Sequence, residues 1–86
     1  MNFDELLDFV VKSGDRDKYT RLHTWVAAFA EYLDLVVSLK EVERDLAKPD
    51  HGVMLPGTLL IVQGRIMTKI ATLKEMEDAI RKPTTA

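Results

Sequence analysis

The chain has 86 residues, contains no cysteine and carries a formal net charge of −2. A chain of this length forms one domain, residues 1–86, and the absence of cysteine excludes disulfide bonds and thiolate metal sites. Hydrophobic residues make up 47% of the chain and charged residues 30%, a balance typical of globular proteins. The slightly negative charge argues against a nucleic acid as the partner.

Two features of the sequence bear on location. The uninterrupted apolar runs, such as residues 59–62, are all far too short to cross a membrane. Acidic residues stand near the N-terminus, where a signal peptide would carry positive charge. We therefore expect a cytoplasmic protein, or one that acts in the cytoplasm of a host cell, with no membrane partner.

Residues 2–12 are predicted to form a short helix. Acidic residues in its first turn complement the helix dipole, and Gly14 ends it because glycine readily adopts a left-handed conformation. Asp15 or Asp17 is then expected to cap the next helix. Apolar residues at helical spacing form one stripe on the short helix: Phe3, Leu6, Leu7, Val10 and Val11.

The stretch from Tyr19 to Lys48 contains neither glycine nor proline, and we expect one long helix over residues 16–48. Its apolar residues form two overlapping stripes, whereas one stripe is enough for a helix with a single neighbour. The surplus must be covered by the N-terminal helix, by a second chain, or by both. The first stripe comprises Leu22, Trp25 or Val26, Phe29, Leu33, Val36, Leu39 or Lys40, and Glu43; the second comprises Trp25, Phe29, Tyr32, Val36, Leu39, Val42 and Leu46.

A turn follows the long helix, because Pro49 cannot continue it. Residues 53–55 form either a loop over the core or the first turn of the next helix, with Pro56 near its start. A third helix is predicted over residues 58–81 and a flexible tail over residues 82–86. Its seam, spaced by three and four residues, contains Leu59, Val62, Ile66, Lys69 or Ile70, Leu73, Met76 or Glu77, and Ile80.

The second and third helices are expected to pack as an antiparallel hairpin. A turn near residue 53 places residue i opposite about residue 106 − i, which brings Glu31 beside Glu75. Gly64 costs about 1 kcal/mol within a helix, so we expect it at a close contact between helices. The predicted fold is therefore all-α: a short N-terminal helix followed by a long antiparallel helical hairpin, completed by oligomerisation.

An aromatic ridge on the long helix is the first candidate binding surface. It consists of Trp25, Phe29 and Tyr32, and Val36 continues it. Aromatic side chains dominate both protein cores and binding hot spots. We expect Trp25, Phe29, Tyr32 and Val36 to be divided between the core and contacts with a second chain or a protein partner, in a homodimer or higher oligomer.

Two pairs of acidic residues form an enzyme-like pattern. Glu31 and Asp34, and likewise Glu75 and Asp78, stand one turn apart on a helix, and four converging carboxylates could hold Mg²⁺. The pattern is similar to that of the all-α nucleoside triphosphate pyrophosphatases of the MazG type, in which an E-x-x-E pair precedes an E-x-x-D pair; here the first pair ends in Asp34. The resemblance implies a Mg-dependent nucleotide pyrophosphohydrolase. Solvated acids on separate helix faces are the simpler interpretation.

A basic cluster at the start of the long helix is the other alternative. Free N–H groups at a helix N-terminus attract anions, so the cluster could bind a phosphorylated ligand or nucleotide. Asp15 and Asp17 cancel much of its charge, and a solvated capping segment is the simpler interpretation. The candidate ligand-binding residues are Lys12, Arg16, Lys18, Arg21 and His23.

The remaining sequence offers little catalytic chemistry. Without cysteine, the two histidines, His23 and His51, lack the partners of a structural zinc site. We find no nucleophile or phosphate-loop motif and expect no cofactor. The leading hypothesis is a small non-enzymatic interaction protein, a bacterial or bacteriophage-type inhibitor, adaptor or co-chaperone, that binds a partner protein as a helical oligomer.

Overall fold

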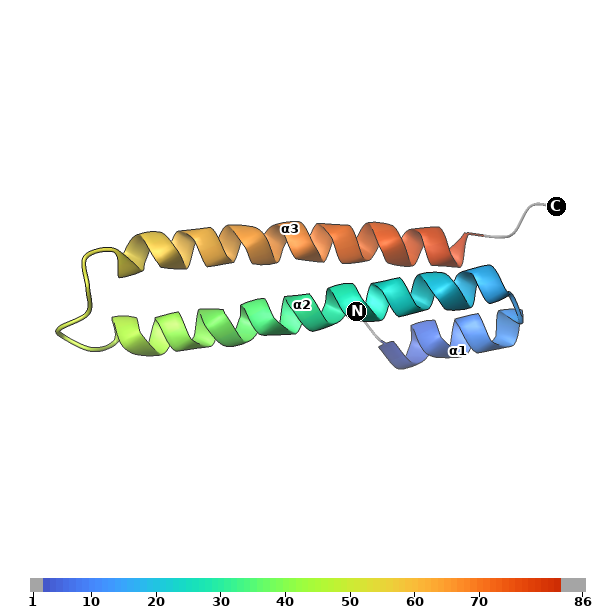
Figure 1. Cartoon of the computed structure of the whole chain (residues 1–86), viewed down its shortest axis with the longest axis horizontal. Coiled ribbons are helices and arrows are strands. Elements are labelled where there is room, and N and C mark those ends of the chain that lie inside the picture. The colour runs from blue at the N-terminus through green and yellow to red at the C-terminus, as the bar shows by residue number, and fades with distance from the viewer. Residues whose placement is uncertain (1–2, 83–86) are drawn as a thin grey trace.

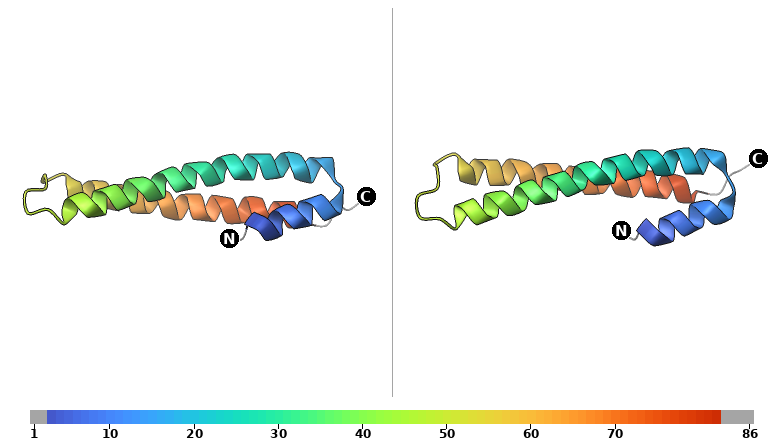
Figure 2. Two further views of the ribbon diagram at one scale, coloured as in Figure 1. Left: turned by 90° about the horizontal axis from the view of Figure 1, so that it is seen from below. Right: turned by 60° about the horizontal axis from the view of Figure 1, so that its bottom comes forward.

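The computed structural model describes residues 3–82 and contains three α-helices in this range (Figure 1). Helix α1 spans Phe3–Ser13, α2 spans Arg16–Leu46 and α3 spans Leu55–Arg81. Helices α2 and α3 run antiparallel, and α1 folds back beside the first turns of α2 (Figures 1 and 2). The all-α fold, a short helix followed by a long helical hairpin, is confirmed. The expected helix start at residue 2 and the tail residues 83–86 lie outside the described range.

The reversal between α1 and α2 occupies only two residues. Gly14 adopts a left-handed φ of 64°, which glycine does without steric cost. The Asp15 carboxylate caps α2 by accepting a hydrogen bond of 2.9 Å from the Asp17 backbone N–H. These local residues turn α1 back onto α2 and decide that Asp15, and not Asp17, is the cap.

The turn between α2 and α3 differs from the prediction. Helix α2 ends at Leu46, and α3 begins at Leu55, three residues earlier than expected. Pro56 stands in the first turn, where a missing N–H costs no hydrogen bond. Val53 and Met54 belong to the turn and Leu55 to the helix, which decides between the two alternatives for this segment.

The earlier start of α3 shifts the register of the hairpin. The Trp25 indole N–H donates to the Leu73 carbonyl oxygen, and Lys69 pairs with Glu31. Residue i therefore lies opposite about residue 99 − i, and not 106 − i, in the antiparallel hairpin. The prediction that Glu31 lies beside Glu75 was wrong for this reason.

The core of the molecule lies at one end, which we call the closed end: α1, residues 16–29 of α2 and residues 70–82 of α3. Here α1 closes the groove between the two long helices (Figure 2). Trp25 is only 1% exposed and stacks between Phe3 and Phe29, with ring centroids 5.9 and 5.2 Å away. The buried core comprises Leu6, Val10, Leu22, Trp25, Leu73 and Ile80.

Lys18 joins the three helices of the closed end. Its side chain is buried, and its ammonium group donates hydrogen bonds to the carbonyl oxygens of Ile80 and Lys82, each 2.5 Å away. The same ammonium lies 5.6 Å from the centre of the Phe9 ring on α1. Lys18 thus satisfies carbonyl groups that the end of α3 leaves without helical partners.

The other end is a two-helix segment, which we call the arm: residues 30–46 of α2, the turn, and residues 55–69 of α3. Val62 is the only arm residue in the buried class, and the other seam residues are half-buried. On α2 the second of the two predicted stripes faces α3. Gly64 lies in the arm, and a Cβ atom built on it meets nothing within 4 Å, so the expected close contact at Gly64 was wrong.

Helix α2 is also long and apolar enough to cross a membrane by length and composition. Uninterrupted apolar runs do not reveal this property, because Glu31 and Asp34 interrupt the apolar sequence of α2. Core helices of soluble proteins and signal sequences meet the same criteria. Length and composition by themselves therefore assign no membrane role to α2. Only 11% of the apolar window is buried within the chain, which means that α2 keeps much apolar surface after folding.

Candidate interaction surface

The aromatic ridge lies inside the hairpin. Trp25 is fully buried, while Phe29, Tyr32 and Val36 are half-buried. Phe29 and Tyr32 pack against the core, and their ring centroids are 5.7 Å apart. These four residues therefore face α3 and α1, and the surplus apolar surface of α2 is carried by other residues.

Helix α2 presents a second apolar line next to its seam. Val26, Ala30, Leu33 and Val37 follow one another at spacings of four, three and four residues, so they share one side of the helix. All four are exposed, with Val26 at 41%, Leu33 at 48% and Val37 at 57%. The signal for them was present in the sequence, because Val26 and Leu33 belong to the first predicted stripe.

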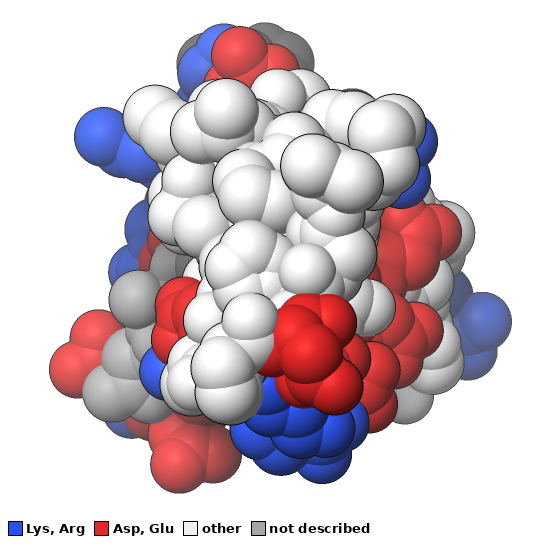
Figure 3. Space-filling model, turned by 90° about the vertical axis from the view of Figure 1, so that its left-hand side faces the viewer, with Lys and Arg blue, Asp and Glu red and all other residues white. Residues whose placement is uncertain are grey.

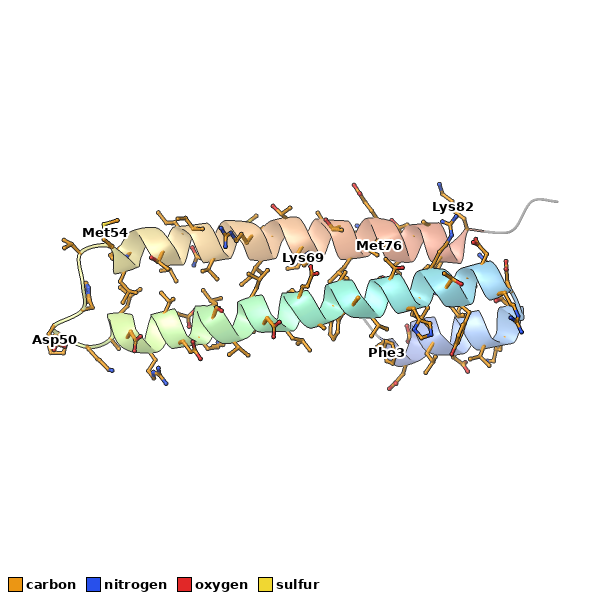
Figure 4. All side chains as sticks on the ribbon, in the orientation of Figure 1. Phe3, Asp50, Met54, Lys69, Met76 and Lys82 are labelled. Atoms are coloured by element: carbon orange, nitrogen blue, oxygen red, sulfur yellow. The ribbon has the colours of Figure 1, made fainter. Side chains whose placement is uncertain are left out.

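Helix α3 presents a matching line. Leu60, Met67 and Ile70 are exposed large apolar residues, with Met67 at 72%. Ile70 stands one position after Lys69, which occupies the seam and lies between α3 and α2 (Figure 4). The structure thus selects Lys69 for the seam and leaves Ile70 on the surface.

Both apolar lines lie on the side of the hairpin that α1 covers at the closed end. On α2, Val26 lines the space beneath Phe3 and Leu7 of α1. On α3, Arg81 follows Met67 by two heptads, which places both residues on one side of the helix, and its guanidinium lies 5.5 Å from the Phe9 ring of α1. We call this surface the apolar flank: Val26, Ala30, Leu33, Val37, Leu60, Met67 and Ile70.

The opposite side of the arm is polar. It contains an open groove of about 810 Å³, across which Lys69 Nζ lies 2.5 Å from Glu31 Oε2. Leu35 and Ile61 contribute the apolar part of its lining. We call this surface the polar flank: Glu31, Asp34, Ser38, Arg65, Thr68 and Thr72.

The turn end of the arm is also largely uncharged. Viewed along the rod, a column of uncharged side chains crosses this end, with acidic and basic groups beside and below it (Figure 3). Val53 is 95% exposed and Met54 is 81% exposed. Met54 and Asp50 mark this end, which is far from Phe3 at the free end of α1 (Figure 4).

The structure separates the members of the basic cluster. Lys18 is buried and bonded to α3, while Lys12 pairs with Asp8 and Arg21 with Asp17. The hydrogen bond from Lys12 to Asp8, together with the charge of that carboxylate, raises the pKa of Lys12. The other two members of the cluster, Arg16 and His23, are exposed.

The histidines have local contacts. His23 packs edge-on against Tyr19, with ring centroids 4.8 Å apart. In the turn between α2 and α3, His51 Nδ1 lies 3.1 Å from the Gly52 carbonyl oxygen. Neither contact brings a second histidine or a carboxylate to the ring.

The two carboxylate pairs do not form a metal site. Within residues 3–82, no group of three or more histidine, aspartate and glutamate side chains is arranged to hold a metal ion. Glu31 and Asp34 line the polar flank, where Glu31 pairs with Lys69. Glu75 and Asp78 are exposed on α3 at the closed end. The register places Glu31 opposite about residue 68, about seven residues away from Glu75, and the geometry required by the pyrophosphatase resemblance is not formed.

The fold and this surface define a helical hairpin with a closed, three-helix end and an exposed apolar flank, which begins at Val26 and Ile70 at the border of the closed end and continues along the arm. No protein-family model, curated protein or solved structure matches the chain.

Proposed function

We propose that this protein is a non-enzymatic interaction protein that binds a partner protein through the apolar flank of its arm. The observation that carries the proposal is the alignment of seven exposed apolar side chains from two helices on one side of the hairpin. Monomeric soluble proteins rarely expose a continuous apolar surface of this kind, and such surfaces mark binding sites. Inhibitors, adaptors and co-chaperones of bacteria or bacteriophages all act by occupying another protein in this way.

The shape of the apolar flank favours a helical partner. Its two lines of side chains run parallel to the long axis and form ridges with a groove between them, into which the side chains of another helix can pack. Large flexible side chains such as Met67 and Leu60 adapt to the partner surface. The polar flank, in contrast, carries charged and hydroxyl groups beside Leu35 and Ile61.

Matched charge substitutions on the two flanks test this proposal. The purified chain is immobilised and exposed to a lysate of the organism that encodes it, alongside the variants Leu33→Glu and Thr68→Glu. Leu33 lies on the apolar flank and Thr68 on the polar flank, and both are exposed, so neither change disturbs the core. We expect a specific protein to be retained by the wild type and by Thr68→Glu, and lost with Leu33→Glu. Equal retention by all three chains would contradict the proposal.

A further inference from the structure

We propose that the partner of the apolar flank is a short amphipathic helix of another protein, which lies end to end with α1 and completes a three-helix bundle along the arm. This inference rests on the proposed function, because it names the class of partner that the same surface binds. In the complex, the partner helix takes on the arm the position that α1 takes at the closed end, and it runs in the same direction as α1.

The closed end shows what the hairpin binds on this side. The occupant there is α1, an amphipathic helix of 11 residues that contacts both long helices. Its residues Leu6 and Val10 are buried, and Phe3 stacks on Trp25 of α2. Helix α1 begins at Phe3, beside the first exposed residues of the apolar flank (Figure 2). A helix from another chain can therefore continue the interface that α1 already makes.

The positions that pack with α1 recur along the arm at heptad spacing. Leu22 on α2 and Leu73 on α3 are buried in one cluster with Leu6 and Val10 of α1. Residues seven apart lie on one side of a helix in a bundle, and the later members of both series are apolar but only half-buried. The site of α1 is thus repeated on the arm, where the chain itself supplies no third helix. The two series are Leu22, Phe29 and Val36 on α2, and Leu73, Ile66 and Leu59 on α3.

Exposed side chains of the apolar flank border this site on both helices. Leu33 follows Val26 by one heptad on α2 and is 48% exposed, and Ile70 on α3 is 42% exposed. A helix bound over the half-buried series also covers Leu33 and Ile70. Its own contact side must then carry apolar residues at spacings of three and four, as in α1.

Charged residues of α2 limit the length of the partner helix. The apolar line ends at Val37, and the same side of α2 continues with the exposed residues Lys40, Glu41 and Arg44. The rise from Val26 to Val37 is about 17 Å at about 1.5 Å per residue. A helix of about three turns, as long as α1, fits this distance, whereas a longer apolar helix would pack on charges.

The near end of the site favours the direction of α1. The first turn of α1 carries the exposed acidic residues Asp4 and Glu5. A partner helix that runs in the same direction brings its C-terminus to this turn, so its negative dipole end meets the positive end of α1. Lysine or arginine in its last turn would face the two carboxylates. At the far end, opposite charges alternate on α2 and favour neither direction.

A synthetic peptide with the sequence of α1, Phe3–Ser13, is a suitable probe, because it has the expected apolar stripe and carries Lys12 in its last turn. The fluorescein-labelled peptide is titrated with the full chain, and fluorescence anisotropy measures binding. The wild type and Thr68→Glu should bind it with a dissociation constant on the order of tens of micromolar. Leu33→Glu and Ile70→Glu should each weaken binding at least about tenfold, because each places an unpaired carboxylate beneath the helix. Circular dichroism checks that the variants remain helical.

A fusion removes the dependence on the affinity of the free peptide. An isolated helix of this length is only marginally stable in water, so the same sequence is joined ahead of the first residue of the chain by a flexible glycine-serine linker. The fused helix can then reach the arm in the direction of α1. It should raise the midpoint of thermal unfolding by about 5 °C, and Leu33→Glu should abolish the increase. An unchanged midpoint together with absent peptide binding overturns the proposal.

Disulfide formation tests the direction, since the native chain has no cysteine. A peptide with a cysteine added after its last residue should cross-link to chains with Val26→Cys. A peptide with a cysteine added before its first residue should cross-link to chains with Val37→Cys. The reverse pattern overturns the assigned direction.

The two proposals fail separately. If capture from the lysate depends on Leu33 while neither the peptide nor the fused helix binds, the helical class of partner is refuted and the proposed binding surface stands. If the peptide binds as described while retention from the lysate is the same for Leu33→Glu and Thr68→Glu, the proposed function is refuted and the helix site stands. Co-sedimentation with phosphatidylcholine vesicles that depends on Leu33, without peptide binding, would assign the flank to a membrane and overturn both.

Discussion

The closed end and the arm are built from the same two long helices, but their side chains are buried to very different extents. At the closed end, α1 adds a third wall, and Leu6, Trp25 and Leu73 are almost completely inaccessible to water. Along the arm two helices share one seam, and only Val62 reaches the buried class. The comparison teaches that one added helix of 11 residues converts a half-buried seam into a core.

The difference follows from geometry. Two helices touch along a line, so each seam residue is covered on one side and open to water on the other. A third helix in the groove covers that open side over its own length, which ends at Phe3 beside Trp25. Beyond this point the apolar residues of α2 continue without α1, and they are available to another chain.

The largest expected effect comes from removing the side chain at the centre of the closed end. Trp25→Ala deletes the ring that stacks on Phe3 and Phe29 and should lower the free energy of unfolding by about 3–5 kcal/mol. Ile61→Ala, an exposed change in the arm, should alter it by less than about 0.5 kcal/mol. Urea denaturation followed by circular dichroism measures both values. Similar losses for the two variants would remove the distinction between the two ends.

A smaller effect is expected at the buried ammonium group. Lys18→Met keeps most of the side-chain volume but removes the donor to Ile80 and Lys82, and it should destabilise the chain by about 2 kcal/mol. Lys12→Met is the matched control, because Lys12 is exposed and its pair with Asp8 is worth little. The same denaturation experiment compares them. A neutral Lys18→Met would show that these hydrogen bonds do not hold α3 to α2.

The arm should become more stable when its backbone is restricted. Gly64 stands in the interior of α3, and a Cβ atom there meets no neighbour. Gly64→Ala should therefore raise the free energy of unfolding by about 1 kcal/mol, through the lower conformational entropy of the unfolded chain. Thermal and urea denaturation measure the change. A loss of stability would reveal a close approach to another chain at Gly64, on the polar flank.

The smallest effect is expected for the lysine in the seam. Lys69→Leu replaces a half-buried cation that pairs with Glu31 by an apolar residue, and it should change stability by about 0.5 kcal/mol or less, because the lost ion pair is offset by better burial. The register should be less well defined, since a polar seam residue specifies alignment. Distances between spin labels at Ser38 and Ile61 should show a broader distribution. An unchanged distribution combined with a clear loss of stability would contradict this role.

The sequence predicted the elements well where neighbouring residues decide them. Gly14 ends α1, an aspartate caps α2, and a proline-containing turn separates α2 from α3. These features depend on the conformational limits of single residues and on hydrogen bonds two or three residues apart. The seam of α3 was likewise predicted from spacing, apart from the choices between Lys69 and Ile70 and between Met76 and Glu77.

The register and the surface residues could not be predicted in the same way. A proline near the start of α3 is compatible with a helix beginning at Leu55 or later. Because α2 also ends two residues earlier than predicted, the turn lies earlier in the chain, and the residue opposite a given position of α2 shifted by about seven. This shift separated Glu31 from Glu75 and thereby dispersed the predicted carboxylate site. Periodicity also allowed two apolar stripes on α2, and it contained no information on which stripe faces α3.

By itself, the sequence determined three helices, their order and a surplus of apolar surface on the longest one, because helix formation and amphipathic spacing are properties of nearby residues. The tertiary structure decided the alignment of α2 with α3, the burial of Lys18 and the side of the hairpin on which α1 lies. Those depend on contacts between residues far apart in the chain, such as Lys18 with Ile80 and Trp25 with Leu73, whose energies no local pattern contains.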